Sequence, residues 1–586
     1  MDNLYRIIGK KIIINVQGRV CETPDELLSS GLFKEVVKQC LRDLKDRDAL
    51  LISLFRDEPT SDEDIAHRLT EIFKLLCKLS LKQTASAFRG KETLLRHPLL
   101  LAEFVEYLYN YWRGFNRYVI CNSEGDTLDR RPYRTFNDTI GTLTHLIRAV
   151  YRDIQENITG DHPRIYRQVP AGAEVAAISL PKPIGLPEGV YERLAEVPVI
   201  RQVLINPPLI LNPSMNKRTG QFVKVSQNPL ELVDIKPDEW LCYPARVGPL
   251  YILVYFNERF FELGFSLCNL FELAGDDILP ETPDAVYLFG VPGNALDSLN
   301  VFPTVFHEDE ENEIFTAAVP ARDEFGYFGY LKKMVLTLHN AIMMRKGKLP
   351  FHGAFIRIVL RGGIDKNVLI IGDTGAGKSE MLEAFRVIGH DLLRDIIVIA
   401  DDMGSVDIND DGDIIGYGTE IGAFLRLDDL RPGYAFGQMD RSIIMGPSQV
   451  NAMIVLPVTT YDTVMRGHRI DIVLYANNYE QVDEEHPIIE RFSTVEQAVH
   501  VFREGTVMSK GTTTSSGIVH SYFANIFGPP QYRDLHDRLA HVFFNAFFSK
   551  GVFVGQIRTR LGITGYETEG PEAAARELLS EMQKLS

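Results

Sequence analysis

The sequence predicts an α/β protein of several domains, and three observations support this prediction. An apolar run at Val368–Ile371 leads into a glycine-rich turn and then a helical pattern of apolar residues. Short β-rich runs such as Leu250–Phe256 stand between prolines, and another apolar run at Ile396–Ala400 reads as a buried strand. A chain of 586 residues exceeds a single hydrophobic core, so about three or four domains are expected.

Composition limits the class of protein. Hydrophobic residues make up 45% and charged residues 24%, values typical of a soluble globular protein. The net charge of −17 argues against a general nucleic-acid binder, although it is compatible with a local basic pocket. The six cysteines are scattered without a C-x-x-C pair, as in reduced cytosolic proteins. Met1–Val20 lacks a signal-peptide core, and no stretch is long enough to span a membrane. We therefore expect a cytoplasmic protein without nucleic-acid or membrane partners.

Changes in composition and residue pattern along the chain predict four regions. Residues 1–165 are expected to be mostly helical, and residues 166–320 to form an α/β domain on the substrate side. Residues 321–530 hold the glycine-rich turn, and residues 531–586 form a helical segment that completes this domain.

Individual elements follow from local signals. The first region is predicted to open with a strand at Ile12–Val16, and Thr23-Pro-Asp-Glu26 is a capping box that starts a helix. Another helix is expected from Ser61, and the aromatic-rich run Phe104–Tyr118 also has helical spacing. Further predicted elements are strands at Leu250–Phe256, Ala285–Phe289 and Val552–Ile557 and a final helix at Pro571–Leu585.

The turn after Val368–Ile371 has the spacing G-x-x-x-x-G-K-S of a phosphate-binding P-loop. Its glycines let backbone N–H groups point at phosphate oxygens, and the start of the next helix adds partial positive charge. The lysine can reach the outer phosphates, and the serine hydroxyl can hold a divalent cation. The predicted nucleotide-binding residues are Gly372, Asp373, Thr374, Gly375, Ala376, Gly377, Lys378 and Ser379.

Two carboxylates follow the apolar run Ile396–Ala400, namely Asp401 and Asp402. A strand that ends in this way, parallel to and beside the P-loop strand, delivers carboxylates to the metal ion that the phosphates share. Further on, Asp407–Asp413 imitates the start of a calcium loop, but Gly418 stands where the bidentate Glu is required. A turn between two hairpin strands is the better interpretation.

A second group of residues precedes the P-loop. Tyr327-Phe-Gly-Tyr-Leu-Lys-Lys333 comes before Pro350-Phe-His-Gly353. In this order, and together with the P-loop and the two aspartates, these segments resemble phosphoenolpyruvate carboxykinase, particularly its ATP-dependent class. The P-loop sequence, with Phe351–Gly353 and Ala400–Asp402, is equally similar to bacterial HPr kinase/phosphorylase. The two families share a nucleotide-binding fold, and the resemblance covers roughly residues 285–560.

The resemblance implies roles for individual residues. Lys333, His352 and Asp402 become ligands of a divalent metal, and Tyr327 faces the substrate. Asp401 would lie near the magnesium bound to the nucleotide. Arg441 stands where the carboxykinase has an arginine that contacts phosphoenolpyruvate and the transferring phosphoryl group, although this match is looser.

The implied fold is a carboxykinase-like nucleotide-binding domain with a mixed sheet, preceded by an α/β domain and an extra helical region. The implied reaction converts oxaloacetate and ATP (or GTP) into phosphoenolpyruvate, ADP (or GDP) and CO2, with Mg²⁺ and Mn²⁺ as cofactors. The carboxykinase motif Arg-Ser-Pro-Lys-Asp, whose arginine holds the substrate carboxylate, is absent, and Arg218 is a degenerate candidate for its place. Residues 1–165 have no counterpart in the family.

The residue types alone leave alternatives. Lys332-Lys333 is by itself typical of a solvated helix face, and His352 of a hydrogen-bonded core histidine. One alternative function is an HPr-kinase-like enzyme that phosphorylates a small-molecule or protein hydroxyl, with one carboxylate as general base. Another is a nucleotide-binding regulatory protein that has lost turnover. The P-loop lysine and both aspartates are retained, which favours an enzyme.

Overall fold

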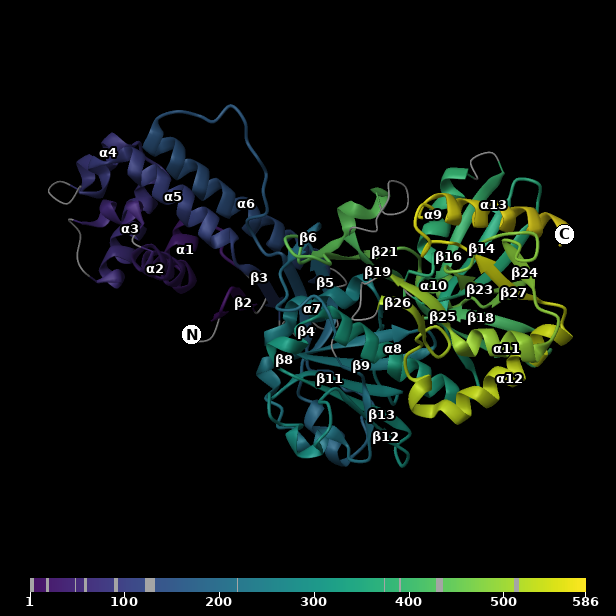
Figure 1. Ribbon diagram of the computed structural model, residues 1–586. Helices are drawn as coiled ribbons and strands as arrows, with labels where there is room; N and C mark the ends of the chain where they lie inside the picture. Colours follow the sequence, from purple (N-terminus) through teal and green to yellow (C-terminus); the bar gives the residue numbers. More distant parts are fainter. Residues whose placement is uncertain are drawn as a thin grey trace. The chain divides into compact units, whose positions relative to one another are not determined.

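The computed structural model describes residues 5–16, 20–47, 49–56, 61–88, 93–121, 132–218, 220–373, 375–388, 392–427, 436–510 and 516–585. Its helices and mixed sheets confirm the predicted α/β class (Figure 1). The chain divides into two compact units, which are described separately. Unit 1 comprises Met1–Leu180 and Ile200–Asn206, and unit 2 comprises Pro181–Val199 and Pro207–Ser586.

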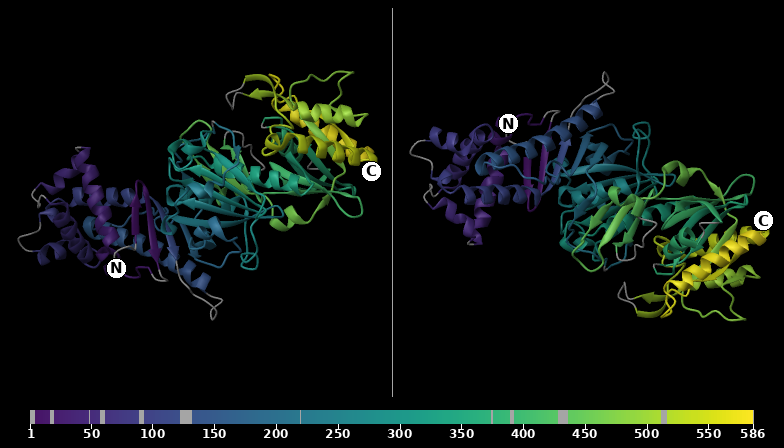
Figure 2. Two further views of the ribbon diagram at one scale, coloured as in Figure 1. Left: turned by 90° about the horizontal axis from the view of Figure 1, so that it is seen from below. Right: turned by 90° about the horizontal axis from the view of Figure 1, so that it is seen from above.

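Unit 1 combines a helical cluster with a small sheet. Its helices bury a continuous apolar core in which Leu41, Leu69 and Phe104 are fully buried, and the purple and dark blue ribbons gather around it in both views of Figure 2. The helices are α1 (Pro24–Ser29), α2 (Gly31–Asp46), α3 (Asp62–Leu76), α4 (Leu81–Ala87), α5 (Pro98–Arg113) and α6 (Pro132–Thr159). The strands are β1 (Tyr5–Ile8), β2 (Lys11–Val16), β3 (Asn116–Cys121), β4 (Val175–Leu180) and most of β5 (Val199–Ile205).

The predicted starts of two helices in unit 1 are confirmed. Thr23 caps α1 through a complete capping box with Glu26, and α3 begins directly after Ser61. Two predictions need correction. The opening strand is joined by β1 and β3, and the aromatic-rich run is helical only to Arg113, because Asn116–Cys121 pairs in parallel with β2. Aromatic side chains suit strands as well as helices, so spacing alone placed this boundary wrongly.

The first half of unit 2 is built on a mixed sheet with the order β8-β9-β11-β13-β12-β7, and β10 pairs with β8. Its central strands are buried on both faces, as in β9, whose first seven residues are all buried. The predicted strands at Leu250–Phe256 and Ala285–Phe289 are confirmed as β9 and β11. The elements are β7 (Val223–Val225), β8 (Trp240–Val247), β9 (Leu250–Asn257), α7 (Phe261–Phe265), β10 (Glu272–Leu273), β11 (Ala285–Val291), β12 (Val305–Asp309), β13 (Ile314–Pro320) and the buried helix α8 (Phe328–Arg345).

The second half of unit 2 contains the P-loop sheet, with the order β22-β18-β17-β14-β15-β23-β27-β24, and β16 also pairs with β14. The helices α9 and α13 pack together over its core (Figure 1). The strands are β14 (Leu349–Leu360), β15 (Asp365–Ile371), β16 (Leu393–Ala400), β17 (Met403–Ile408), β18 (Ile414–Gly418), β22 (His468–Arg469), β23 (Ile472–Asn477), β24 (Ile489–Arg491) and β27 (Phe553–Arg558). The helices are α9 (Lys378–Ile388), α10 (Tyr461–Met465), α11 (Val495–Glu504), α12 (Arg533–Ser549) and α13 (Glu569–Lys584).

Two smaller sheets complete unit 2. One has the order β19-β21-β20-β6, and the other is the hairpin β25–β26. Their strands are β6 (Leu209–Leu211), β19 (Gly422–Arg426), β20 (Ile443–Met445), β21 (Met453–Pro457), β25 (Thr506–Lys510) and β26 (Ser516–His520). The hairpin interpretation of Asp407–Asp413 is confirmed, because this turn joins the antiparallel strands β17 and β18. In the part of the chain that the structure describes, no helix combines the length and the apolar character needed to cross a membrane.

Candidate functional site

The P-loop lies between β15 and α9, as the sequence predicts. Gly375 and Gly377 have φ angles of +79° and +100°, in the left-handed region that favours glycine. A Cβ atom on Gly377 would lie 2.7 Å from the Thr559 hydroxyl, so this position excludes a side chain on steric grounds as well. Thr374 lies outside the described residues.

Two side chains from neighbouring strands hold the P-loop in place. Asn478, directly after β23, donates from Nδ2 to the Gly375 carbonyl over 2.9 Å and to the Met508 carbonyl over 3.0 Å. Thr559, directly after β27, donates to the Ala376 carbonyl over 2.7 Å. Neither residue was predicted from the sequence. The available signal was a polar residue immediately after an apolar strand.

The P-loop lysine is folded back onto its own loop. Lys378 Nζ donates to the carbonyls of Gly372 and Asp373, and the side chain is 8% exposed. Burial lowers the pKa of Lys378, while the carboxylates of Asp402 and Asp373 act in the opposite direction. Ser379 is exposed in the first turn of α9, where its hydroxyl is accessible to a ligand. A phosphate group in the loop would give the ammonium an acceptor of opposite charge.

The strand order corrects one prediction. β16, which ends at the two aspartates, is not the neighbour of the P-loop strand, because β14 pairs antiparallel with both β15 and β16. β16 therefore runs parallel to β15 but one strand away. β14 and β15 form an antiparallel hairpin, and β14 therefore lies between β15 and β16. This position can be seen only from the pairing of the strands in the sheet.

This arrangement puts His352 in the centre of the site. The Gly372 amide donates to the His352 carbonyl over 3.2 Å, and the Gly353 amide donates to the Asp402 carbonyl over 2.9 Å. β16 and β17 lie along the same edge of β14, and Asp401-Asp402 is the interruption between them. The start of β14 thus joins the P-loop to the aspartates through backbone hydrogen bonds.

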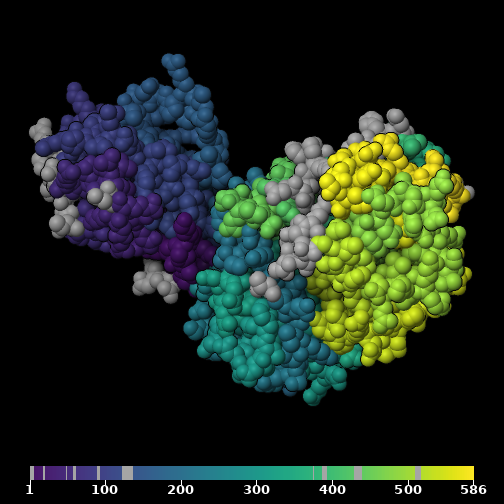
Figure 3. All heavy atoms as spheres, in the orientation of Figure 1, coloured from purple at the N-terminus to yellow at the C-terminus, as the bar shows by residue number. Residues whose placement is uncertain are grey.

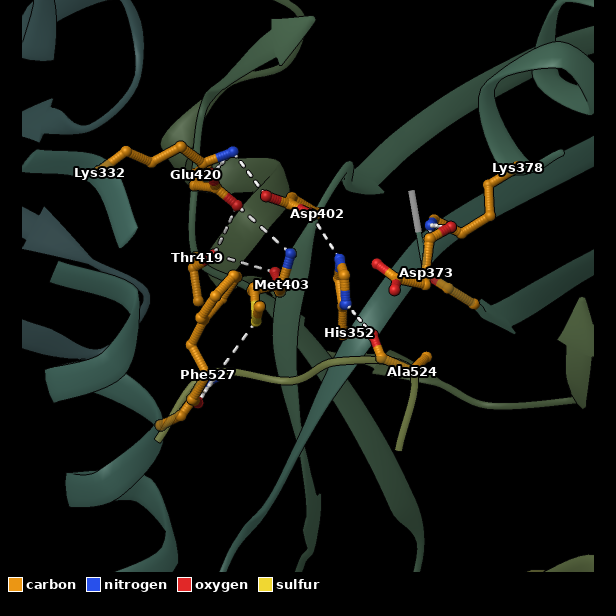
Figure 4. A network of polar contacts seen from close by, with 12 residues as sticks. Lys332, His352, Asp373, Lys378, Asp402, Met403, Thr419, Glu420, Ala524 and Phe527 are labelled. Atoms are coloured by element: carbon orange, nitrogen blue, oxygen red, sulfur yellow. Dashed lines mark hydrogen bonds and ion pairs between the residues drawn. The ribbon is translucent and has the colours of Figure 1, made fainter. Parts of the chain in front are cut away.

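The ring of His352 is fixed at both nitrogens (Figure 4). Nδ1 donates to the Ala524 carbonyl, and Nε2 lies 2.9 Å from Asp402 Oδ1. The carbonyl comes from a turn in which Phe523, Ala524 and Asn525 all have φ between +43° and +60°. Because the carbonyl can only accept, Nδ1 carries a proton, and Nε2 faces the Asp402 carboxylate at hydrogen-bond distance.

Lys332 is a buried structural cation rather than part of a solvated helix face. Its ammonium lies 2.7 Å from Asp402 Oδ2 and 2.9 Å from Glu420 Oε1, and the residue is 1% exposed (Figure 4). Burial opposes the charge of Lys332, but the carboxylates of Asp402 and Glu420 raise its pKa above the ordinary value. Burial raises the pKa of Glu420 to about 7 against the attraction of Lys332. Sequence analysis did not single out Glu420.

The adjacent Lys333 has different surroundings. Its ammonium lies 4.6 Å from the centre of the Phe527 ring, and the Arg218 guanidinium lies 5.4 Å from the same ring. Burial lowers the pKa of Lys333 to about 8, and Asp402 acts in the opposite direction. Burial also lowers the pKa of Arg218. Over the described residues, neither cation has a carboxylate within ion-pair distance.

The remaining predicted residues divide between two places. Tyr327 is half-buried at the start of α8 and contacts Phe424, and burial raises its pKa to about 12 while Lys332 and Arg218 oppose this shift. Arg441 ends the short 3₁₀ helix Phe436–Arg441 with an exposed side chain. Its carbonyl accepts from Asn269 over 2.9 Å, and the described contacts do not bring its guanidinium to the cluster.

The predicted metal ligands match only in part the residue types that usually bind metal ions. Among the described residues, no cluster of three or more His, Cys, Asp or Glu side chains is placed to hold a metal ion. The predicted set takes only His352 and Asp402 from those residue types and adds Lys333. Burial raises the pKa of Asp401 to about 6, while the positive charge of Lys332 opposes this shift. A nearby cation would favour the ionised form of this carboxylate.

No protein-family model matches this chain, and no curated protein matches it.

Proposed function

We propose that this protein transfers the terminal phosphoryl group of a nucleotide, and that the reaction is of the phosphoenolpyruvate carboxykinase type. One observation carries the proposal. Backbone hydrogen bonds at the start of β14 join Asp402 to the P-loop, and the negative charge of Asp402 raises the pKa of both Lys378 and Lys333 against the effect of burial. Such an arrangement suits two anions that react with each other beside a carboxylate-bound cation.

On the donor side, the P-loop would hold the phosphates of ATP or GTP. Asn478 and Thr559 bind the carbonyls of Gly375 and Ala376, so these two side chains do not compete with a phosphate for the loop amides. Lys378 would exchange its loop carbonyls for phosphate oxygens and neutralise charge on the transferring group.

On the acceptor side, Lys333 and Arg218 would hold a small anionic acid such as oxaloacetate or phosphoenolpyruvate. Both cations are half-buried, share the Phe527 ring and lack a carboxylate partner in the described structure. The guanidinium of Arg218 suits a carboxylate, because its planar N–H groups match the two oxygens. This geometry supports Arg218 as the replacement for the missing carboxylate-binding arginine.

The residues present fit a divalent metal ion. The fixed Nδ1 proton of His352 leaves Nε2 as a ligand, and this atom faces an oxygen of Asp402. His352 and Asp402 would hold this ion, while Lys333, whose pKa of about 8 leaves it mostly protonated at pH 7, would bind the anionic acid. Ser379 and Asp401 would lie near the magnesium of the nucleotide. When bound, Mn²⁺ or Mg²⁺ supplies Lewis-acid stabilisation for negative charge on the keto oxygen.

In the proposed reaction, Arg218 and Lys333 orient the keto acid so that its C–C bond to the departing carboxylate breaks and CO2 leaves. The enolate oxygen that forms then attacks the γ-phosphorus, and ADP leaves with the electrons of the broken P–O bond. Lys378 holds the γ-phosphate in line with this oxygen. Tyr327, protonated because of its raised pKa, can donate a hydrogen bond to the bound acid.

A hydroxyl kinase similar to HPr kinase is the second candidate, and Asp401 favours it. With its pKa raised to about 6, this carboxylate has the proton affinity that suits a general base near neutral pH. In this alternative Asp401 would take the proton of the attacking hydroxyl, and Lys333 would not be required for phosphoryl transfer.

The test is formation of ATP from ADP, phosphoenolpyruvate and bicarbonate with Mg²⁺ and Mn²⁺. We expect product from the wild type and less than about 1% of that rate from Lys378→Met and His352→Gln. His307→Gln is the matched control, because His307 also contacts a backbone carbonyl through Nδ1, 3.1 Å from Val225 O, but lies on β12. Its rate should equal that of the wild type.

The opposite result separates the two candidates. ADP binding without product would remove the carboxykinase reaction and favour a hydroxyl acceptor. Transfer of phosphate from ATP to a hydroxyl that persists in Lys333→Met and disappears in Asp401→Asn would establish the kinase instead.

A further inference from the structure

Unit 1 contains a groove that the proposed reaction does not use. The connection from α6 to β4 runs back along α6, as Figure 1 shows, and its blue atoms form the upper edge of the helical unit in Figure 3. Residues 161–168 of this connection are all exposed. The groove has a volume of about 380 Å³ and is lined by Glu22, Thr142, His145, Leu146, Arg148, Ala149, Arg152 and Gln168.

Two arginines of α6 are held in fixed positions in this groove. Arg148 donates from Nε and Nη2 to the Val169 carbonyl over 3.0 and 2.7 Å, and from Nη2 to the Gln168 carbonyl over 3.2 Å. Arg152 donates from Nη2 to Gln168 Oε1 over 3.2 Å and stacks 4.6 Å from the centre of the Tyr166 ring. Both guanidinium groups are therefore oriented before any ligand arrives, which reduces the entropy lost on binding.

The wall that faces these arginines is also fixed. Carbonyls further along the connection accept from unit 1 side chains, including Pro170 from Arg113 over 3.1 Å, Ala171 from Trp112 over 2.6 Å and Gly172 from Arg117 over 2.7 Å. On the other side, the Tyr166 hydroxyl donates to Glu156 of α6 over 2.6 Å, so the connection is anchored before and after the groove residue Gln168 and the groove is formed without a ligand.

The arginines retain unused hydrogen-bond donors. Within the described residues, Nη1 of Arg148 and Nε and Nη1 of Arg152 have no hydrogen-bond acceptor, and neither guanidinium is paired with a carboxylate. The exposed ring of His145 adds further nitrogen atoms to the groove. Glu22 carries the one carboxylate among the groove residues that the structure describes. A locally basic groove stands out on a chain whose net charge is −17.

We propose that this groove binds a small phosphorylated molecule and is separate from the P-loop. Arginine donors that are fixed in a fork and lack a carboxylate are the groups that recognise phosphate oxygens. The volume lies within the range of about 300–1,000 Å³ that is usual for small-molecule sites. The groove would give unit 1 a ligand of its own.

The first experiment measures pyrophosphate binding to the full chain carrying Lys378→Met, which disables the P-loop. We expect calorimetry to show one bound pyrophosphate per chain. Arg152→Gln in the same background should weaken binding by at least about tenfold, because it removes one charged donor group. Arg42→Gln is the control, since Arg42 is also an exposed arginine of unit 1 but lies on α2 and outside the groove.

A second variant separates ligand binding from the architecture of the groove. Tyr166→Leu removes the stacking partner of Arg152 but leaves both guanidinium groups, so it should retain binding within about threefold. Trypsin provides a readout that needs no activity, because Arg164 and Arg167 are exposed on the connection. Pyrophosphate should slow cleavage after these two residues in the Lys378→Met chain, and it should have no such effect with Arg152→Gln.

Two results would overturn the proposal. One is the absence of pyrophosphate binding in the Lys378→Met chain, and the other is equal affinity with Arg152→Gln and Arg42→Gln. Protection of Arg164 and Arg167 by a poly-glutamate peptide but not by pyrophosphate would instead assign the groove to an acidic peptide. None of these outcomes depends on phosphoryl transfer, so the groove and the proposed reaction can fail independently.

Discussion

The adjacent residues Lys332 and Lys333 differ in whether their positive charge is paired with carboxylates. Lys332 is surrounded by Asp402 and Glu420 at ion-pair distance, so its charge is neutralised within the fold. Lys333, the next residue, shares an aromatic ring with Arg218 and has no such partner among the described carboxylates. Successive residues of a helix point about 100° apart, so adjacent identical side chains reach different surroundings. A paired charge stabilises the fold, whereas an unpaired one is available to a ligand.

The largest expected effect separates these lysines by stability. Lys332→Met leaves two buried carboxylates without their cation and should lower the free energy of unfolding by about 3–5 kcal/mol. Lys333→Met removes a charge whose burial is unfavourable, so the free energy of unfolding should change by less than about 1 kcal/mol or rise. Urea unfolding of both variants measures the difference, and equal losses would contradict the comparison.

A second paired charge extends the comparison to pH. Burial opposes the charge of Glu308, but hydrogen bonds from Arg345, Lys224 and Tyr532 lower its pKa to about 2. A lowered carboxyl pKa stabilises the fold above the ordinary value near 4.5, and this contribution is lost as the pH falls toward 2. Glu308→Gln should therefore lower the free energy of unfolding by about 3 kcal/mol at pH 7 and by clearly less at pH 3.

The control for that experiment is Glu310→Gln, because Glu310 lies 3.7 Å from the same arginine but is 81% exposed. It should change stability by less than about 0.5 kcal/mol at either pH. An effect of Glu308→Gln that does not depend on pH would contradict the assigned ion pairs.

A neutral partner should matter less than a charged one. Asn478→Ala removes the hydrogen bonds that hold the Gly375 carbonyl and the backbone of Met508. The P-loop backbone should become less ordered, and its affinity for ADP should fall by about tenfold in a calorimetric titration. Asn545→Ala, which removes an exposed amide of α12, should leave the affinity unchanged. An unaltered affinity for Asn478→Ala would show that the loop keeps its shape without this side chain.

The smallest expected effect concerns the turn that supplies the carbonyl to His352. Ala524 has a φ angle of +59°, which is unfavourable for a residue with a Cβ atom and easy for glycine. Ala524→Gly keeps the carbonyl and should raise the free energy of unfolding by about 1 kcal/mol. Ala540→Gly in the middle of α12 should lower it by a similar amount, about 1 kcal/mol. The same sign for both substitutions would contradict the left-handed assignment.

The sequence predicts well whatever depends on local pattern. The P-loop, the strand before it and the helix after it follow from the spacing of glycine, lysine and apolar residues, and the structure contains all three. The elements Phe553–Arg558 and Glu569–Lys584 also agree with prediction. These features need no information about distant parts of the chain.

Contacts between segments that lie far apart in the chain could not be predicted from the sequence. The place of β14 between β15 and β16 depends on sheet register, and the burial of Lys332 depends on Glu420, which lies far along the chain. Asn478 and Thr559 bind the P-loop only because β23 pairs with β15 and β27 pairs with β23 in the sheet. Arg441 was chosen by its position in the sequence, and its exposed side chain does not join the described cluster.

The most direct test of the account is the binding of phosphoenolpyruvate to the chain saturated with ADP and Mn²⁺. Calorimetry should show one bound molecule per chain in the wild type and a loss of at least about tenfold in affinity for Lys333→Met. Lys346→Met, in which the lysine paired with Asp284 at 2.6 Å is removed, should bind as the wild type does. Equal affinity for Lys333→Met and Lys346→Met would contradict the claim that the unpaired cations form the substrate site.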